Sequence, residues 1–254
     1  MATFKTFDGF ELHYDLRALP GGPPVVLLHS FGLDSDLWQN VGVTDALLEA
    51  GRTVLFYDAR GHGRSAKPHD SAAYGSNAMA RDLTSLLDHL GIGAVDLVSY
   101  SMGSMVALRV LQLESRIRAA VLGGVGERAL HTQPPEWRSQ AADGFEADDP
   151  ELCPAGLRYA RDRADRLDGD RHALAAVLRA GFSPAESDYQ NVQAAVLILT
   201  GARDHGGPPE PLAQMLPGAR SVTIDADHAT AMEHPDFIPN ITSFLAQGTP
   251  PPAY

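Results

Sequence analysis

The sequence has a single cysteine, Cys153, among 254 residues. One thiol cannot form a disulfide within the chain, so disulfide-stabilised scaffolds are excluded. The opening residues, MATFKTFDGF, also lack the basic and then apolar run of a signal peptide. Both absences favour a protein of the reducing cytoplasm.

Positive charge and long apolar runs are also scarce. The chain has 20 Lys and Arg against 32 Asp and Glu, a formal net charge of −12, which is the wrong sign for neutralising phosphates. The longest apolar runs, such as residues 25–28 and 196–199, fall far short of the roughly 18 residues that span a bilayer. We therefore expect no nucleic-acid partner and no membrane partner.

Aromatic residues make up only 7% of the chain, but 44% of the residues are hydrophobic, which is enough for a folded core. Short apolar, β-rich runs recur along the sequence and alternate with helical patterns. The expected strands are residues 25–28, 53–57, 95–98, 119–122, 195–199 and 221–224, and the clearest helical patterns are residues 79–90 and 237–245. Strands that are apolar throughout and alternate with helices predict an α/β fold with a mostly parallel, doubly wound sheet.

Two segments depart from this alternation. Residues 6–15 predict an antiparallel hairpin with Asp8-Gly9 as its turn. Residues 127–191 are polar and then helical, and a segment of this length between two strands predicts a helical cap insert. The predicted organisation is a core of residues 1–126 and 192–247, the cap of residues 127–191, and a flexible tail of residues 248–254.

A turn after the strand at residues 95–98 has the pattern of a nucleophile elbow, SYSMGS, followed by a helical pattern. The turn must be tight, so the residues two before and two after the nucleophile need very small side chains. Gly103 meets this demand, whereas Ser99 stands where the motif has glycine. The pattern predicts that Ser101 is a nucleophile at the end of the sheet.

Suitable partners for Ser101 follow in the sequence. Asp204 ends the loop LTGARD after one strand, and His228 follows the last strand. The order Ser, Asp, His, with each residue at the carboxyl end of a strand, is the order of the α/β-hydrolase class. The chain resembles this superfamily in five blocks, LLHSFG at 27–32, YDARGHGRSAKP at 57–68, SYSMGS at 99–104, LTGARD at 199–204 and DHATAMEHPDFI at 227–238.

The resemblance implies a role for each residue. His228 would take the proton of Ser101, and Asp204 would hold the imidazole in the right tautomer. The backbone N–H groups of Phe31 and Met102 would stabilise the oxyanion. Glu127 follows a neighbouring strand and is the competing candidate for the acid.

Other candidate sites are weaker. His228 and His234 lack the companions of a metal motif, and the Gly61-His62-Gly63 turn is not a nucleotide fingerprint, so we expect no metal and no cofactor. His29 and His62 are expected to support the loops around the site. Possible substrate-pocket residues are Phe31, Trp38, Tyr100, Met102 and Trp137.

The resemblance favours a serine hydrolase that cleaves a small carboxylic ester or a lactone. Carbon-carbon bond hydrolases, cofactor-free perhydrolases or oxygenases, and thioesterases use the same three residues and stay as alternatives. A noncatalytic ligand-binding module on the hydrolase fold is the alternative of another class.

Overall fold

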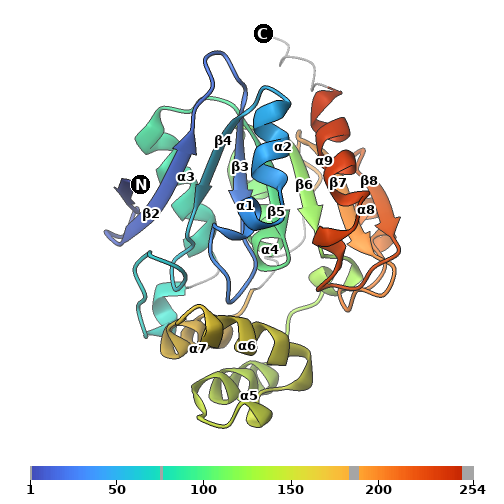
Figure 1. Cartoon of the computed structure of the whole chain (residues 1–254). Coiled ribbons are helices and arrows are strands. Elements are labelled where there is room, and N and C mark those ends of the chain that lie inside the picture. Colours follow the sequence, from blue (N-terminus) through green and yellow to red (C-terminus); the bar gives the residue numbers. More distant parts are fainter. Residues whose placement is uncertain (1, 75–76, 183–188, 248–254) are drawn as a thin grey trace.

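A computed structural model describes residues 2–74, 77–182 and 189–247 of the chain (Figure 1). Its centre is an eight-stranded sheet with the strand order β1-β2-β4-β3-β5-β6-β7-β8. The strands are β1 (Ala2–Lys5), β2 (Glu11–Arg17), β3 (Pro24–Leu28), β4 (Thr53–Tyr57), β5 (Val95–Tyr100), β6 (Ile117–Gly123), β7 (Ala195–Gly201) and β8 (Arg220–Ile224). Strands β1 and β2 pair antiparallel, β2 pairs antiparallel with β4, and every other pair is parallel. The predicted fold class is confirmed.

The N-terminal hairpin has a wider connection than the predicted two-residue turn. Lys5 pairs with Glu11, so residues 6–10 form the loop. The hydroxyl of Thr6 donates to Asp8 Oδ1 at 2.6 Å and accepts the backbone N–H of Phe10 at 3.0 Å. The backbone N–H of Thr6 donates to Phe10 O at 2.9 Å and that of Gly9 donates to Thr6 O at 3.0 Å, so backbone bonds close the loop and the Thr6 side chain adds to them. The sequence alone did not indicate the side-chain bonds.

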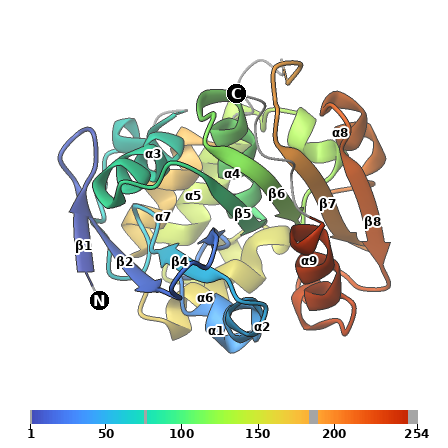
Figure 2. The same cartoon turned by 90° about the horizontal axis from the view of Figure 1, so that it is seen from above.

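Helices cover both faces of the sheet (Figure 2). Helices α1 (Leu37–Asn40), α2 (Val43–Glu49) and α9 (Phe237–Ala246) lie on one face, and α3 (Ala78–Leu90), α4 (Met102–Leu113) and α8 (Glu210–Met215) lie on the other. Helix α3 ends where Gly91 takes the left-handed conformation, with φ +64°, as its predicted stop at this glycine requires. The helices predicted at residues 79–90 and 237–245 are confirmed.

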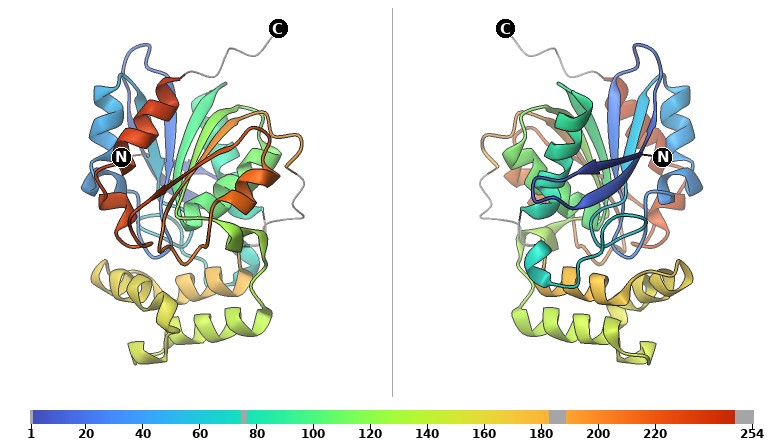
Figure 3. Two further views of the ribbon diagram at one scale, coloured as in Figure 1. Left: turned by 90° about the vertical axis from the view of Figure 1, so that its right-hand side faces the viewer. Right: turned by 90° about the vertical axis from the view of Figure 1, so that its left-hand side faces the viewer.

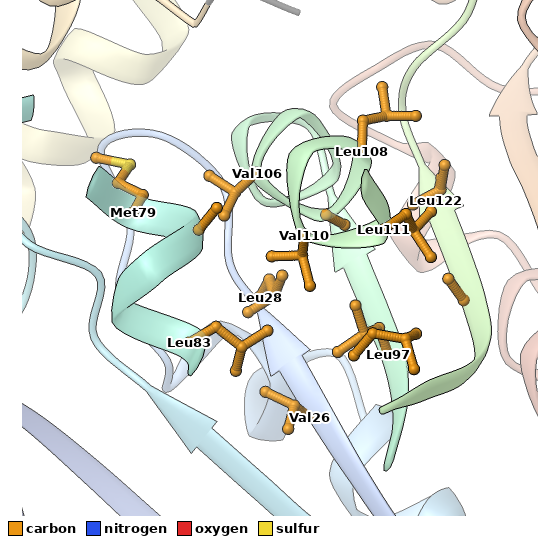
Figure 4. Packing of buried hydrophobic residues seen from close by; sticks show 14 of the residues in the cluster. Val26, Leu28, Met79, Leu83, Leu97, Val106, Leu108, Val110, Leu111 and Leu122 are labelled. Atoms are coloured by element: carbon orange, nitrogen blue, oxygen red, sulfur yellow. The ribbon is translucent and has the colours of Figure 1, made fainter. Parts of the chain in front are cut away.

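The apolar runs fill the core between these layers. All residues of β5 are buried because the strand lies in the middle of the sheet, under helices on both faces. Figure 4 shows the cluster on the α3 and α4 side, in which helix side chains pack on β3, β5 and β6. Its labelled members are Val26, Leu28, Met79, Leu83, Leu97, Val106, Leu108, Val110, Leu111 and Leu122.

A helical unit connects β6 to β7 and lies beyond one end of the sheet (Figures 1 and 3). It contains α5 (Pro135–Glu146), α6 (Arg158–Arg166) and α7 (Arg171–Ala180), with the short 3-10 helices η2 (Glu127–Leu130), η3 (Pro150–Leu152) and η4 (Ala155–Leu157). Phe145, Leu174 and Leu178 belong to its own hydrophobic cluster. The buried Arg161 donates to Gly144 O and Ala147 O, both at 2.9 Å, and so joins α6 to the end of α5.

Two further 3-10 helices, η1 (Ser71–Tyr74) and η5 (Ala231–Glu233), lie in loops of the core. The predicted tail, residues 248–254, lies outside the described residues. No helix in the described part of the chain combines the length and the apolar character needed to cross a membrane.

Candidate functional site

The turn between β5 and α4 holds Ser101 in a strained conformation. Its φ is +53° and its ψ is −113°, a region that residues with a Cβ atom rarely adopt. The turn also brings Gly103 against the end of β3, where a Cβ atom on Gly103 would lie 2.1 Å from Leu28 O. Only glycine fits there, as the elbow pattern predicts, and the tight turn lifts Ser101 out of the sheet edge.

Ser101, His228 and Asp204 form one chain of hydrogen bonds. His228 Nε2 lies 2.9 Å from Ser101 Oγ, and His228 Nδ1 lies 2.9 and 3.0 Å from the two carboxylate oxygens of Asp204. An ionised carboxylate only accepts hydrogen bonds, so the neutral imidazole carries its proton on Nδ1. Nε2 is then free to accept the Ser101 hydroxyl, which is the arrangement that proton transfer from the serine requires.

Asp204 lies in the loop that follows β7, with only 8% of its surface exposed. Burial raises the pKa of this carboxyl, but the hydrogen bond from His228 and the electrostatic interaction with that residue outweigh burial and bring the pKa below its ordinary value. The backbone N–H of Gly206 donates a further bond to Asp204 Oδ1 at 2.7 Å. The carboxyl is therefore ionised at neutral pH and fixed in orientation.

Two neighbours contact the His228 segment. The hydroxyl of Tyr100 donates to His228 O at 2.7 Å, and the two rings lie 5.3 Å apart. The ring of His205 lies 4.1 Å from that of His228, and desolvation followed by the nearby His228 lowers the pKa of His205. Both contacts restrict how the imidazole can turn.

The competing acid, Glu127, lies in η2 and is exposed. Its backbone N–H donates to Pro208 O at 2.9 Å, while its carboxylate has no hydrogen-bond or ion-pair partner among the described residues. In this structure the acid that contacts His228 is Asp204.

The predicted oxyanion donors come from two separate segments of the chain, both of which line the cavities beside Ser101. Met102 is the first residue of α4, and Phe31 follows the end of β3. Within the described part of the chain, neither backbone N–H donates to another protein atom. His29 fixes this loop, because Ala59 N–H donates to Nε2 at 2.9 Å and Nδ1–H donates to Ser30 O at 2.8 Å.

A buried aspartate, Asp58, supports the same loop and was not singled out from the sequence. Its carboxylate accepts the N–H groups of Ser35, at 2.9 Å, and Arg64, at 2.8 Å. Burial raises the pKa of Asp58, but hydrogen bonds from Ser35 and Arg64 bring it to about 2. The signal was present in the YDARGHGRS block, where an aspartate directly follows a buried strand.

Two cavities open beside Ser101. One, of about 350 Å³, lies between η2, α5 and α7, and the other, of about 430 Å³, lies between α1, α6 and η5. Trp137 lines the first cavity and Tyr100 lines the second, while Phe31 lines both. Met102 lines the first cavity, and His205 lies where the two cavities meet.

The structure corrects the prediction for Trp38. This residue is fully buried in the cluster between the sheet and helices α2 and α9, and it lines neither cavity. Helix α1 directs its indole into the core, where the ring buries its large apolar area although Nε1 has no hydrogen-bond partner among the described residues. Arg128 and Arg138, which the sequence did not single out, line the first cavity instead.

Donor atoms from Asp204, His205 and His228 lie within 4.8 Å of one another, so these residues have the composition of a cation site. However, both ring nitrogens of His228 already have partners, the Asp204 carboxylate at Nδ1 and Ser101 Oγ at Nε2. A cation bound through His228 would have to displace one of them. The arrangement therefore favours proton transfer over metal binding.

Comparisons with known proteins agree with this geometry. A family model described as the alpha/beta hydrolase fold matches residues 23–151. The chain is 38% identical to a putative non-heme chloroperoxidase of Synechocystis over 114 residues, or 44% of this chain and 39% of the relative. It is also 38% identical to a putative carbamate hydrolase of Variovorax paradoxus over 112 residues, or 44% of this chain and 40% of the relative. The matches thus span about two fifths of the length of these curated relatives.

Solved structures match over nearly the whole chain. An enol-lactonase from Burkholderia xenovorans superposes with a TM-score of 0.77 and 25% identity, covering 96% of this chain and all (100%) of that one. A thermophilic esterase from Thermogutta terrifontis superposes with a TM-score of 0.79 and 25% identity, covering 98% of this chain and 99% of that one. The family model, the sheet order and the elbow agree, and the chain belongs to the α/β-hydrolase superfamily.

Proposed function

We propose that the protein is a serine hydrolase that cleaves a small carboxylic ester or a lactone through an acyl-enzyme on Ser101. The observation that carries this proposal is the unbroken hydrogen-bond chain from Ser101 Oγ through His228 to Asp204. A serine hydroxyl is a weak nucleophile at neutral pH unless a base takes its proton. His228 is the group that contacts Ser101 Oγ and has a free acceptor for that proton.

The reaction would proceed in two halves. Ser101 Oγ attacks the carbonyl carbon of the substrate while its proton moves to His228 Nε2, and the imidazolium then protonates the leaving alkoxide. In the second half a water molecule attacks the acyl carbon, gives a proton to Nε2, and Ser101 recovers its proton as the acid leaves. Asp204 stabilises the imidazolium in both halves through Nδ1–H.

The tetrahedral oxyanion of each half needs donors that are already in place. The free N–H groups of Phe31 and Met102 are suited to this role, and such donors are worth about 3 to 4 kcal/mol each in other hydrolases. His29 and Gly103 act as positioning residues. Gly103 lets the first turn of α4 approach the end of β3, and the His29 ring ties the loop after β3 to Ala59.

The helical unit, residues 127–191, would serve as the cap. Helices α5 and α7 contribute walls of one cavity and α6 contributes a wall of the other, so substrate size would depend on this unit. Cavities of about 350 and 430 Å³ suit a small organic ester with an acyl part and an alcohol part on either side of Ser101. A cytoplasmic location fits the single, buried Cys153.

A fluorophosphonate probe tests this proposal. We expect one covalent adduct on the wild-type protein, located at Ser101 by peptide mass spectrometry, and none on Ser101→Ala. The wild-type protein should also hydrolyse p-nitrophenyl esters, while Ser101→Ala retains only a residual rate several orders of magnitude lower. A folded wild-type protein that neither reacts with the probe nor turns over any ester, lactone or diketone would support the noncatalytic binding module.

A further inference from the structure

The arginines of this chain fall into two groups. Most form an ion pair with a carboxylate, including the buried Arg60 and Arg161. The described arginines without a carboxylate within ion-pair distance are Arg81, Arg109, Arg128, Arg138, Arg163 and Arg220. Only the members of the second group that lie near Ser101 can contribute to the site.

Three arginines of the second group have other partners far from the site. Arg81 stacks on the ring of Phe7, Arg109 donates to two amide oxygens, and Arg220 contacts Gln247 and the ring of Phe244. The other three, Arg128, Arg138 and Arg163, all line the cavities beside Ser101. Thus the described arginines that have no carboxylate, amide or aromatic side chain as a partner line the cavities where a substrate would bind.

The titratable side chains that line the cavity of about 350 Å³ are all basic. Its charged or titratable lining residues are Arg128, Arg138, His131, His205 and His228, and none of the described lining residues is an aspartate or a glutamate. The whole chain carries a net charge of −12, so an acid-free cavity with two arginines is a local reversal of the overall charge.

The two arginines of this cavity are held from different elements. Arg138 on α5 donates from Nη1 to Ala180 O at 2.8 Å and to Arg179 O at 3.3 Å, at the last turn of α7. Gly181 leaves room for this contact, since a Cβ atom there would lie 2.7 Å from Arg138 Nη1. Arg138 Nε is buried and has no partner in the described part of the chain.

Arg128 lies in η2, next to the loop that carries Asp204. Its backbone N–H donates to Gly206 O at 3.0 Å, which fixes the backbone of η2 against that loop. Its guanidinium is exposed and has no hydrogen-bond or ion-pair partner among the described residues. Two backbone carbonyls therefore anchor Arg138, whereas the exposed side chain of Arg128 can turn towards a ligand.

We propose that the substrate carries a carboxylate, which Arg128 and Arg138 bind in the cavity between η2, α5 and α7. A guanidinium presents donors in a planar fork that matches a carboxylate. A bound carboxylate would supply acceptors to the exposed guanidinium of Arg128 and to Nη2 of Arg138, which has no hydrogen-bond partner among the described residues, whereas the buried Nε of Arg138 is out of its reach. The apolar part of the substrate would lie on Trp137 and Phe31, which line the same cavity. This inference rests on the proposed function, because it names the substrate class of that same site.

A matched pair of substrates tests the proposal. 4-Nitrophenyl hydrogen glutarate is an anion at neutral pH, and methyl 4-nitrophenyl glutarate is its neutral counterpart with the same leaving group. For the wild-type protein we expect kcat/KM to be about tenfold or more higher for the anion, the size of one charge-assisted hydrogen bond. Equal values for the two esters, or a preference for the neutral one, would overturn the proposal.

Variants locate the binding group. Arg128→Gln replaces an exposed side chain and so should not disturb folding, and we expect it to reduce the anion preference mainly through KM. The double variant with Arg138→Gln should abolish the preference. Arg166→Gln is the control, because Arg166 lies on α6, pairs with Asp162 and lines neither cavity, so the preference should be unchanged.

The outcomes separate this inference from the proposed function. Hydrolysis of the neutral ester together with labelling of Ser101 would leave the hydrolase intact even if the anion preference is absent. If Arg163→Gln alone removes the preference, the carboxylate lies in the other cavity and the assignment to Arg128 and Arg138 is wrong. If no variant changes an observed preference, the arginines do not bind the carboxylate.

Discussion

The hydroxyl oxygens of Ser99 and Ser104 lie 3.0 Å apart in the buried core beside the turn that carries Ser101. Ser99 Oγ also lies 2.9 Å from Val121 O, and Ser104 Oγ lies 2.8 Å from Gly123 O. Each hydroxyl can therefore donate to a carbonyl of β6. This pairing explains how serine replaces the glycine of the elbow motif, since Ser99 occupies space in β5 without an unsatisfied polar atom.

Ser99→Ala should lower the free energy of unfolding by about 1 kcal/mol, the usual value of one buried hydrogen bond, and leave fluorophosphonate labelling of Ser101 intact. Urea denaturation would measure the first effect and intact-protein mass spectrometry the second. Ser99→Val adds a methyl group at a fully buried position and should destabilise the protein more than Ser99→Ala does. If the alanine variant fails to react with the probe, Ser99 has a role in the site beyond packing.

Gly103→Ala should be among the most damaging substitutions of the core. The new Cβ atom would lie 2.1 Å from Leu28 O and 2.9 Å from His29 O, and these backbone atoms can move only if β3 moves. We expect a loss of about 3 kcal/mol or more in the free energy of unfolding, and slower labelling of Ser101 because the Phe31 loop shifts with β3. The control is Gly93→Ala, where a Cβ atom has nothing within 4 Å. Similar stabilities for the two variants would contradict this packing argument.

Much of the core could be predicted because its pattern is local. The central strands are apolar throughout, and a parallel sheet brings their carboxyl ends to one edge. The elbow pattern and the resemblance to the superfamily then predicted Ser101, Asp204 and His228 at that edge, with Glu127 as the competing acid. The structure brings these three side chains into hydrogen-bond contact. Their catalytic roles stay a prediction until the chemistry is measured.

Other features depended on contacts that no local pattern indicates. Trp38 lies in a helix of four residues, which is too short to show which side faces the sheet. In the loop at residues 6–10, the N–H of Gly9 donates to Thr6 O, so the turn centres on Phe7-Asp8 and not on the predicted Asp8-Gly9. The Thr6 hydroxyl bonds to Asp8 and Phe10 and supports this turn. Arg128 and Arg138 lie in a segment without strand and helix alternation, and they line one cavity only because the helical unit folds over the end of the sheet.

Stability should fall as the pH falls below neutrality, because of buried histidines. His62 is fully enclosed between His29 and Phe31, and desolvation followed by the neighbouring His29 lowers the pKa of His62 to about 3. The unfolded chain protonates this histidine below about pH 6.5, whereas the folded state keeps it neutral down to about pH 3. The unfolded state binds more protons between these values, so acid favours unfolding.

The expected size of this effect is about 2 kcal/mol between pH 7 and pH 5 for His62 alone. Urea denaturation at both pH values would measure it. The free energy of unfolding of His62→Asn should decrease less between pH 7 and pH 5 than that of the wild-type protein, whatever its value at pH 7. His131→Asn is the matched control, because His131 is exposed and its replacement should leave the decrease unchanged. An unaltered decrease in His62→Asn would mean that other groups cause the acid sensitivity.

The Asp204 carboxylate orients the His228 imidazole through Nδ1. In Asp204→Asn the N–H of Gly206 would hold the amide oxygen at the Oδ1 position and turn the amide nitrogen towards His228 Nδ1. That nitrogen donates, so the imidazole would carry its proton on Nε2 and could not accept the proton of Ser101. We expect a loss of up to about 10⁴ in kcat for ester hydrolysis with the fold intact.

Glu127→Gln should leave kcat almost unchanged, because the Glu127 carboxylate contacts neither His228 nor Ser101. Steady-state kinetics on both variants would decide the matter, since the reverse pattern would transfer the role to Glu127 and comparable losses would mean that both acids act on His228.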